Sequence, residues 1–401
     1  MTTQSSRSGL SPARLQRMHD VLARHVDRGT LPGLVTLISR RDETYVDAIG
    51  TQASAGGAPM QRDTLFRIAS MTKPVTAVAA LILVEECKLR LDDPVDEWLP
   101  ELANRQVLKR LNGPLDETVP AQRAITLRDL LTLRMGFGYM TDLAPDFPIW
   151  QAMNERHLAI GPEPTTAPSP AVWMQSLGSL PLMAQPGERW LYETGSDVLG
   201  VLIERVAGQP LEGFMRERIF DPLGMKDTAF SVPPEKLHRL PPCYQGNDDN
   251  GALAIFDAVH GHWSRPPAFP SGGGGLVSTV DDFLAFGQML LNGGKLGNQR
   301  ILSRPAVTVM TTNQLTDEQQ RAASAFFVEP RGWGFGLAVV IGRTDLSMTP
   351  GRFGWEGGYG TSWASDPQEE LTAILMTQLC FPAAAAVYQD FWTGVYQAID
   401  D

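Results

Sequence analysis

Strand-forming segments stand near both ends of this 401-residue chain, and helix-forming segments fill the stretch between them. The early segment, GLVTLISRRDETYVDAIG, has two β-rich runs around a polar turn and predicts a hairpin. The late segments are GWGFGLAVVIG, FGWEGGYGTSWASD and ELTAILMTQLC. Sheet partners from opposite ends of one chain imply a discontinuous α/β lobe, approximately residues 1–69 and 291–401, with a mostly helical lobe of approximately residues 70–290. We expect a site in the cleft between them.

Helical patterns border the predicted strands. Ser11 and Pro12 open an amphipathic run, PARLQRMHDVLARHVD, with a cap and a proline at the first helical position. A second run, AAAAVYQDFWTGVYQAI, closes the chain. The sequence therefore predicts an α/β (α+β) fold in one domain, residues 1–401, with an antiparallel sheet and a helix at each end of the chain.

Composition and charge restrict the class of protein. The formal net charge is −11 and no block of basic residues offsets it, which disfavours nucleic acid as a partner. The start lacks the apolar core of a secretory signal, and the longest apolar run, Val75 to Val84, is about half of a membrane span. We expect a soluble cytoplasmic protein that does not enter a membrane. The three cysteines, Cys87, Cys243 and Cys380, are far apart in sequence, and we expect reduced, buried thiols.

A serine stands three residues before a lysine in FRIASMTKPVTA, and Lys73 is the only lysine of the chain with this spacing. Pro74 is tolerated only in the first turn of a helix, so the helix that contains VTAVAALILVEE must begin at or near Ser70. Residues three apart on a helix share a face, so the amine can approach the hydroxyl. Burial and the helix dipole would disfavour the ammonium form and leave a base. A serine cap beside a solvated lysine is the alternative.

Two further segments carry candidate site residues. Tyr192 follows a Pro-Gly turn and precedes a helical apolar run, a junction that can face a cleft. A core tyrosine with a locally bonded hydroxyl is the alternative. In GWEGGYGTSW, from Gly354 to Trp363, the density of glycines indicates that something must approach the backbone closely. A bulged strand is the alternative.

Taken in order, these segments resemble the serine β-lactamase and penicillin-binding protein superfamily, most closely the family VIII carboxylesterases related to class C β-lactamases. The resemblance extends through LRLDDPVDEWLPE, ITLRDLLT, QPGERWLYETGSDVLGVLIE and PSGGGGLVSTVDDF, nearly the whole chain. It implies a β-lactamase/transpeptidase-like fold. It also implies that Ser70 is the nucleophile, that Lys73 and Tyr192 share its activation, and that the backbone N–H groups of Ser70 and Gly358 form the oxyanion hole.

The sequence departs from the pattern of its relatives at three places. Thr194 replaces the asparagine of a Y-x-N-like motif, and Ser196-Asp197-Val198, which imitates an S-D-N motif, falls inside the following helix and is not assigned to the site. Trp355-Glu356-Gly357 lacks the lysine or histidine of the third motif. We expect Trp355, Glu356, Gly357 and Thr194 to contact substrate. Relatives often read L-L-T-H-T-S-G where this chain has Leu-Leu-Thr-Leu-Arg-Met-Gly, for which we have no physical account.

Other hydrolase chemistries fit less well. The chain has no G-x-S-x-G segment, and its six histidines lie outside the segments above, so neither an α/β-hydrolase elbow nor a Ser-His-Asp triad is indicated. His260 and His262 lack a third ligand nearby, and we predict no metal and no cofactor. The prediction is a serine carboxylesterase for neutral, short to medium acyl esters, with a small-molecule ester as its partner. The alternatives are a β-lactamase, D-peptidase or acyltransferase on the same site, or a catalytically silent acyl-binding protein.

Overall fold

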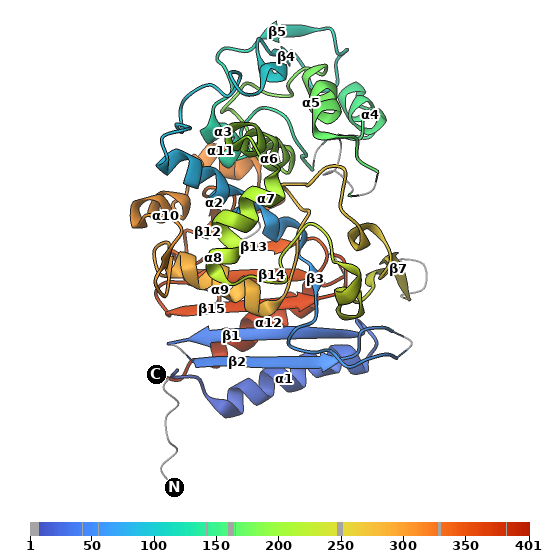
Figure 1. Ribbon diagram of the computed structural model, residues 1–401, viewed down its shortest axis with the longest axis vertical. Coiled ribbons are helices and arrows are strands. Elements are labelled where there is room, and N and C mark those ends of the chain that lie inside the picture. Colours follow the sequence, from blue (N-terminus) through green and yellow to red (C-terminus); the bar gives the residue numbers. More distant parts are fainter. Residues whose placement is uncertain are drawn as a thin grey trace.

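The computed structural model describes residues 8–41, 43–54, 56–141, 143–158, 164, 166–246, 252–327, 330–381 and 383–401. Its largest element is a seven-stranded antiparallel sheet in the order β11-β12-β13-β14-β15-β1-β2 (Figure 1). The strands are β1 (Gly33–Arg40), β2 (Glu43–Gly50), β11 (Arg331–Trp333), β12 (Ala338–Val340), β13 (Phe353–Gly357), β14 (Thr361–Asp366) and β15 (Leu371–Thr377). The early hairpin therefore joins the late strands in one sheet, as the sequence predicts.

Both faces of this sheet are covered. All residues of β1 are buried, and alternate side chains enter different cores because successive residues of a strand point to opposite faces. Leu34 and Ile38 pack with helices α1 (Pro12–Asp27) and α12 (Ala385–Gln397). Val35 and Leu37 belong to the larger core on the other face. The predicted terminal helices thus form one outer layer, seen beside β1 and β2 in Figure 1.

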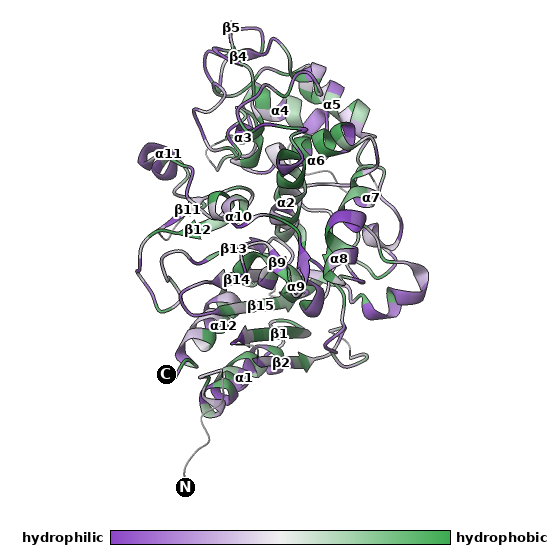
Figure 2. Cartoon of the chain, turned by 60° about the vertical axis from the view of Figure 1, so that its left-hand side comes forward, coloured by the Kyte–Doolittle hydropathy of each residue, from purple (hydrophilic) through white to green (hydrophobic). Residues whose placement is uncertain are grey.

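Helix α2 (Thr72–Glu85) runs through the larger core. Every residue from Thr72 to Leu83 is buried, and Figure 2 shows the helix as an apolar rod in the middle of the molecule. A helix that is apolar all round must be enclosed by other elements. It packs against α6 (Thr194–Ala207), while α9 (Val280–Leu291) lies directly on β14 and β15. The division at residues 69/70 and 290/291 stays a prediction, and α9 contacts the sheet although it precedes the second boundary.

The remaining elements surround α2 and α6. The longer helices are α4 (Pro148–Glu155), α5 (Pro170–Gly178), α10 (Arg304–Met310) and α11 (Asp317–Ala322), and the shorter ones are α3 (Leu127–Leu131), α7 (Leu211–Met215) and α8 (Asp221–Leu223). Short helical turns are η1 (Ala69–Met71), η2 (Pro100–Leu102), η3 (Arg216–Phe220), η4 (Pro234–Arg239) and η5 (His262–Ser264). Two-stranded pairs are β3 (Phe66–Arg67) with β8 (Val277–Ser278), β4 (Gln106–Leu108) with β5 (Thr118–Pro120), β6 (Cys243–Gly246) with β7 (Leu253–Asp257), and β9 (Lys295–Leu296) with β10 (Gln299–Arg300). The sequence patterns do not predict these short pairs.

The cysteines differ from one another in their surroundings. Cys243 is buried, Cys380 is partly buried and Cys87 is exposed, and all three are free. The expectation of buried thiols is therefore wrong for Cys87. The sulfur atoms of Cys243 and Cys380 lie 3.6 Å apart, because β6 runs beside the end of β15.

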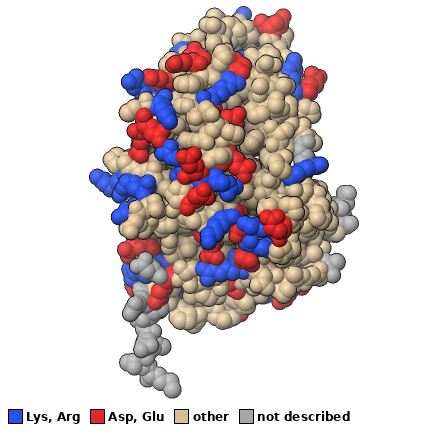
Figure 3. Space-filling view, in the orientation of Figure 1, with Lys and Arg blue, Asp and Glu red and all other residues tan. Residues whose placement is uncertain are grey.

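Charged side chains of both signs are interspersed over the face shown in Figure 3. Ion pairs among the described residues include Arg62 with Asp281, and both Arg239 and Lys236 with Asp227. Within the part of the chain that the structure describes, no helix combines the length and apolarity needed to cross a bilayer.

The packing of α1 against the sheet gives a stability prediction. Leu22 is fully buried between α1 and the sheet, so Leu22→Ala should lower the free energy of unfolding by about 2 to 5 kcal/mol, through lost burial and the cavity left behind. Urea unfolding followed by circular dichroism measures the change. Leu346, which is 54% exposed, is the matched control, and Leu346→Ala should change stability by less than about 0.5 kcal/mol. Equal effects at both positions would contradict this packing.

Candidate active site

Ser70 lies in η1, directly before α2, and Lys73 is the second residue of that helix. Pro74 occupies the first turn, where its missing N–H removes no helical hydrogen bond. Lys73 Nζ lies 3.0 Å from Ser70 Oγ, as the i, i+3 spacing predicts. The Lys73 side chain is fully buried, so the alternative of a solvated lysine beside a serine cap is wrong. Ala69, just before the serine, has φ +45°, which marks a tight backbone bend at this point.

Three oxygen atoms surround the amine of Lys73. Besides Ser70 Oγ, Lys73 Nζ donates to Glu193 Oε2 at 2.5 Å and to the carbonyl oxygen of Gly273 at 2.7 Å. An ammonium group has three donors and no acceptor, so this shell satisfies all of its hydrogen bonds. Lys73 Nζ also lies 4.5 Å from the centre of the Tyr192 ring, a cation–π distance.

The electrostatics of Lys73 differ from the expectation. Burial alone lowers the pKa of a lysine, but the negative charge of Glu193, with smaller contributions from Tyr192 and Asp197, raises the pKa of Lys73 above its usual range. The expectation that burial and the helix dipole leave a neutral amine is therefore wrong for the resting site. The residues around Lys73 in the sequence give no sign of this carboxylate, which comes from 120 residues away.

Tyr192 sits between Lys73 and an aromatic cluster. Trp355 Nε1 donates to the Tyr192 hydroxyl oxygen at 2.8 Å, and the two rings lie 5.9 Å apart. Burial raises the pKa of Tyr192, while the charge of Lys73 and hydrogen bonds with Ser70 and Trp355 offset part of that shift. The Tyr192 hydroxyl is therefore a phenol at neutral pH that lies within reach of Ser70.

The glycine-rich end of β13 passes close to the serine segment. A Cβ atom at Gly357 would clash with the carbonyl oxygen of Ile68, and the Thr361 hydroxyl donates to the same oxygen at 3.1 Å. The close backbone approach inferred from the sequence is thus present, and it accounts for the glycine at position 357. A Cβ at Gly358 would meet open space, so the backbone there is accessible.

The remaining predicted site residues are placed differently from one another. Trp355 is 6% exposed and points toward Tyr192. Glu356 alternates to the opposite side of β13 and pairs with Arg331 at 2.7 Å, so the structure does not bring it to Tyr192. Thr194 is buried as the first residue of α6, and the side chain that reaches Lys73 comes from its neighbour Glu193.

Comparisons with known proteins identify the family and the fold. The family model described as Beta-lactamase matches residues 18–392. The chain belongs to the beta-lactamase family. It is 42% identical over 373 residues to Protein Rv1367c of Mycobacterium tuberculosis, covering 90% of each chain. It is 31% identical to Esterase EstB of Burkholderia gladioli, covering 92% of this chain and 91% of the relative. The solved structure of EstCE1, a hydrolase with promiscuous acyltransferase activity, matches with a TM-score of 0.78 at 26% identity over 96% of this chain and 99% of that one. The predicted superfamily and the β-lactamase/transpeptidase-like fold are confirmed.

Within this beta-lactamase family fold, two carboxylates that were not predicted lie beside the site. Glu193 has φ +78°, unusual for a residue with a side chain, and this conformation accompanies the placement of its carboxylate on Lys73. Asp197 is fully buried and accepts from Ser271 Oγ at 2.6 Å and from the Gly273 N–H at 3.0 Å. Although its segment is not predicted to belong to the site, Asp197 anchors the loop whose Gly273 carbonyl binds Lys73. The sequence does carry one signal for Glu193, because this carboxylate residue directly follows the candidate tyrosine.

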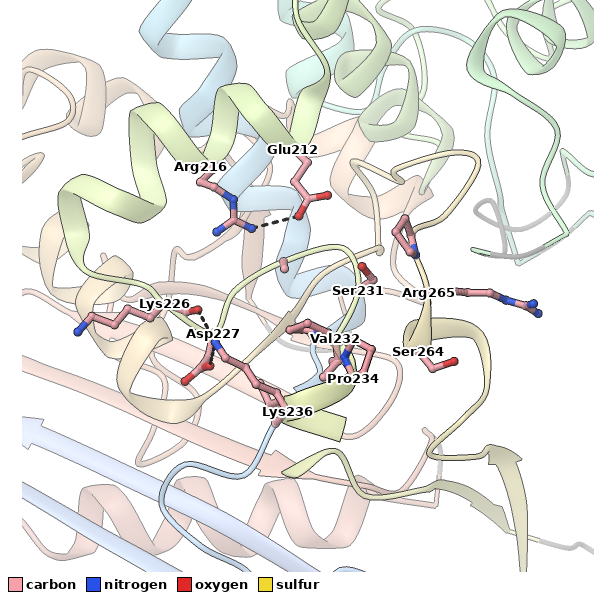
Figure 4. Close-up of a pocket in the computed structure, with 15 residues that line it drawn as sticks. Glu212, Arg216, Lys226, Asp227, Ser231, Val232, Pro234, Lys236, Ser264 and Arg265 are labelled. Carbon is pink, nitrogen blue, oxygen red and sulfur yellow. Dashed lines mark hydrogen bonds and ion pairs between the residues drawn. The ribbon is translucent and has the colours of Figure 1, made fainter. Parts of the chain in front are cut away.

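A separate cavity of about 450 Å³ lies between α7, η4 and the segment 264–266. Figure 4 shows two ion pairs in its lining, Arg216 with Glu212 and Lys236 with Asp227. The lining residues do not include Ser70, Lys73 or Tyr192, so this cavity is distinct from the candidate active site.

The burial of Asp197 gives a pH-dependent prediction. Burial, and then repulsion from Glu193, raise the pKa of Asp197 to about 7 in the folded protein from its ordinary value of 3.8. The folded state therefore holds this proton more tightly than the unfolded state, and the contribution of Asp197 to stability falls as pH rises from 3.8 to 7. Asp197→Asn should be more stable than wild type at pH 8, with a much smaller difference at pH 4.

Melting temperatures at the two pH values measure this difference. The amide oxygen of the asparagine can still accept from Ser271 and Gly273, so the loop contacts are kept. The exposed Asp116 is the matched control, and Asp116→Asn should show no such change with pH. A stability difference for Asp197→Asn that is the same at both pH values would contradict the assignment.

Proposed function

We propose that this protein is a serine carboxylesterase that hydrolyses neutral acyl esters through an acyl-enzyme on Ser70, similar to the family VIII carboxylesterases. The observation that carries the proposal is the 3.0 Å contact between Ser70 Oγ and the buried Lys73 Nζ, next to Tyr192. A nucleophilic hydroxyl requires a neighbouring proton acceptor in hydrogen-bond reach. Esterase EstB, at 31% identity over nearly the whole chain, supports the same reaction class.

In the proposed mechanism Ser70 attacks the ester carbonyl, and its proton leaves through the group formed by Lys73 and Tyr192. The alcohol then departs, and water attacks the acyl-enzyme by the reverse route. The backbone N–H groups of Ser70 and Gly358 would stabilise the oxyanion. The approach of Gly357 to Ile68 and the open space at Gly358 support this pairing. The side chains supply the nucleophile and the proton-transfer groups, so the proposed reaction requires no cofactor.

The aromatic cluster beside Tyr192 supports a preference for neutral acyl groups. Trp355 packs edge-to-face on Trp333 with ring centres 4.7 Å apart, and Phe326 contacts the Tyr192 ring at 5.0 Å. Apolar aromatic surface favours uncharged, apolar groups over carboxylates. Lys73, which is hydrogen-bonded to Ser70, forms an ion pair with Glu193, and Arg331 forms an ion pair with Glu356.

A second candidate function is acyl transfer on the same site. An acyl-enzyme can be attacked by an alcohol as well as by water, and the structural neighbour EstCE1 is a hydrolase with promiscuous acyltransferase activity. Product analysis of p-nitrophenyl butyrate turnover in the presence of an added alcohol separates the two: a new butyrate ester indicates transfer, and butyrate alone indicates hydrolysis.

Ser70→Ala should remove turnover of p-nitrophenyl butyrate while leaving the fold intact, because a nucleophile that acts together with its base leaves only binding and oxyanion effects when it is lost. We expect a fall of at least about 10³-fold in kcat. Mass spectrometry after treatment with a fluorophosphonate probe should show one adduct, on Ser70, in the wild type. An adduct on another residue would instead favour a different nucleophile. No adduct, together with full binding of the ester, would favour a silent acyl-binding protein.

The wild type should prefer neutral esters to carboxylate-bearing lactams. A charge-assisted contact to a substrate carboxylate contributes about 1.5 to 3 kcal/mol, and its loss at Trp355 corresponds to about one to two powers of ten in kcat/KM. The measurement compares kcat/KM for p-nitrophenyl butyrate and nitrocefin on the same preparation. Cleavage of nitrocefin as efficient as that of the ester would overturn the preference.

A further inference from the structure

Glu193 supplies the shortest contact in the candidate active site. Its Oε2 atom lies 2.5 Å from Lys73 Nζ, closer than Ser70 Oγ at 3.0 Å. The carboxylate is largely enclosed, since 15% of its side chain is exposed, and its partner amine is fully buried. Hydrogen bonds between charged groups of this length are among the strongest in proteins. Glu193 stands at the middle position of the tyrosine motif, Tyr192-Glu193-Thr194, where the motif itself specifies no residue type.

The surrounding structure is shaped to hold this carboxylate. Glu193 keeps φ +78°, a conformation that costs about 1 to 3 kcal/mol for a residue with a side chain and persists only where the surroundings impose it. A Cβ at Gly273 would clash with Glu193 Oε1, so the glycine leaves room for the carboxylate in its present position. Gly273 is held in turn by Asp197, and its carbonyl oxygen binds Lys73.

The charged groups that face Glu193 are few. Among the described residues, Lys73 faces it from α2, and Asp197 faces it from α6, with both carboxylate oxygens of Asp197 within 3.2 Å of the position of a Gly273 Cβ. Tyr192 precedes it in the chain. The loop 271–275 adds one serine and four glycines, and therefore no charge. Lys73 is thus the one cation in direct contact with Glu193 in this part of the described structure.

An ammonium at Lys73 cannot take the proton of Ser70 unless it gives up one of its own. The raised pKa of Lys73 favours that ammonium at neutral pH, and the high pKa of Tyr192 keeps the phenol protonated. The group positioned to receive a proton from Lys73 is the carboxylate at 2.5 Å.

We propose that Glu193 is a positioning residue of the esterase site that accepts a proton from Lys73 as Lys73 takes the proton of Ser70. This inference rests on the proposed function. In acylation the Ser70 O–H bond breaks, Oγ bonds to the acyl carbon, Lys73 stays an ammonium and Glu193 becomes a neutral acid. When the bond to the alcohol oxygen breaks, that oxygen takes a proton from Lys73. Glu193 then returns its own proton to Lys73. Glu193 is then a carboxylate again, and atoms and charge balance.

The test is the pH dependence of kcat/KM for p-nitrophenyl butyrate in Glu193→Gln and Glu193→Asp. Glutamine keeps the size and a hydrogen-bond acceptor but cannot accept the proton, so only the neutral form of Lys73 would be active. Without the charge of Glu193, burial lowers the pKa of Lys73, and the acid limb then reports the ionisation of Lys73 itself. We expect a lower kcat/KM at pH 7 and a displacement of the acid limb to alkaline pH by more than about one unit. Glu193→Asp keeps a carboxylate, so its acid limb should stay at the wild-type position even where the rate is lower.

Glu101→Gln is the matched control, because Glu101 also forms an ion pair with a residue of α6, Arg205, but not with Lys73. Its pH profile should equal that of the wild type. If Glu193 were merely structural, glutamine and aspartate would lower the rate at all pH values without moving the acid limb, and this outcome would overturn the inference.

Fluorophosphonate labelling of Ser70 separates this result from a failure of the proposed function. Absence of labelling in the wild type, with Ser70→Ala still active, rejects the esterase mechanism as a whole. Labelling of the wild type together with an unmoved acid limb in Glu193→Gln rejects the role of Glu193 alone. If Glu193→Gln does not fold, as judged by its melting temperature, the pH profile of Glu193→Asp still tests the proposal. An acid limb displaced from its wild-type position in Glu193→Asp contradicts it.

Discussion

The buried ammonium of Lys73 is the group around which the surrounding structure is organised. An isolated charge of this kind is costly to remove from water, and it persists only where its donors and its charge are both compensated. Compensation here comes from three separate elements: η1 through Ser70, the start of α6 through Glu193, and the loop 271–275 through Gly273. The candidate nucleophile is therefore positioned by the same contacts that make burial of the lysine possible.

The glycine-rich loop shows how this requirement extends outward. A Cβ at Gly272 would lie 2.5 Å from the carbonyl oxygen of Ser196, and the Gly272 carbonyl accepts from Thr76 at 2.8 Å. The loop thus packs between α2 and α6, and Asp197 of α6 accepts a hydrogen bond from its Gly273 N–H. One oxygen of Asp197, Oδ2, is buried without a hydrogen-bond partner among the described residues. A carboxyl group that retains its proton leaves less charge uncompensated there, in keeping with its raised pKa.

The sequence was informative wherever local rules decide the structure. Pro74 places the helix start, the three-residue spacing places Ser70 beside Lys73, and β-rich runs near both ends of the chain place the strands of the sheet. It failed where the decisive contact joins distant segments. The charge state of Lys73 depends on Glu193. The residues around Lys73 in the sequence do not indicate a carboxylate at the start of another helix. The same limit leaves Asp197 outside the predicted site, although it anchors the loop that binds Lys73. The substrate contact of Glu356 stays a prediction, and the structure pairs this residue with Arg331.

The ring and the hydroxyl group of Tyr192 contact different groups. One side faces the charge of Lys73, at 4.5 Å from the ring centre, and the hydroxyl faces the indole N–H of Trp355 at 2.8 Å. Trp355 is held in place by packing on Trp333 and Ala338 within an aromatic cluster, so the donor that fixes the Tyr192 hydroxyl is itself rigid. Because that hydroxyl oxygen accepts from Trp355, its own proton is free to point toward Ser70. Trp355 therefore offers apolar surface beside Tyr192 and also fixes the phenol hydroxyl, so in the proposed esterase one side chain would connect substrate preference to proton transfer.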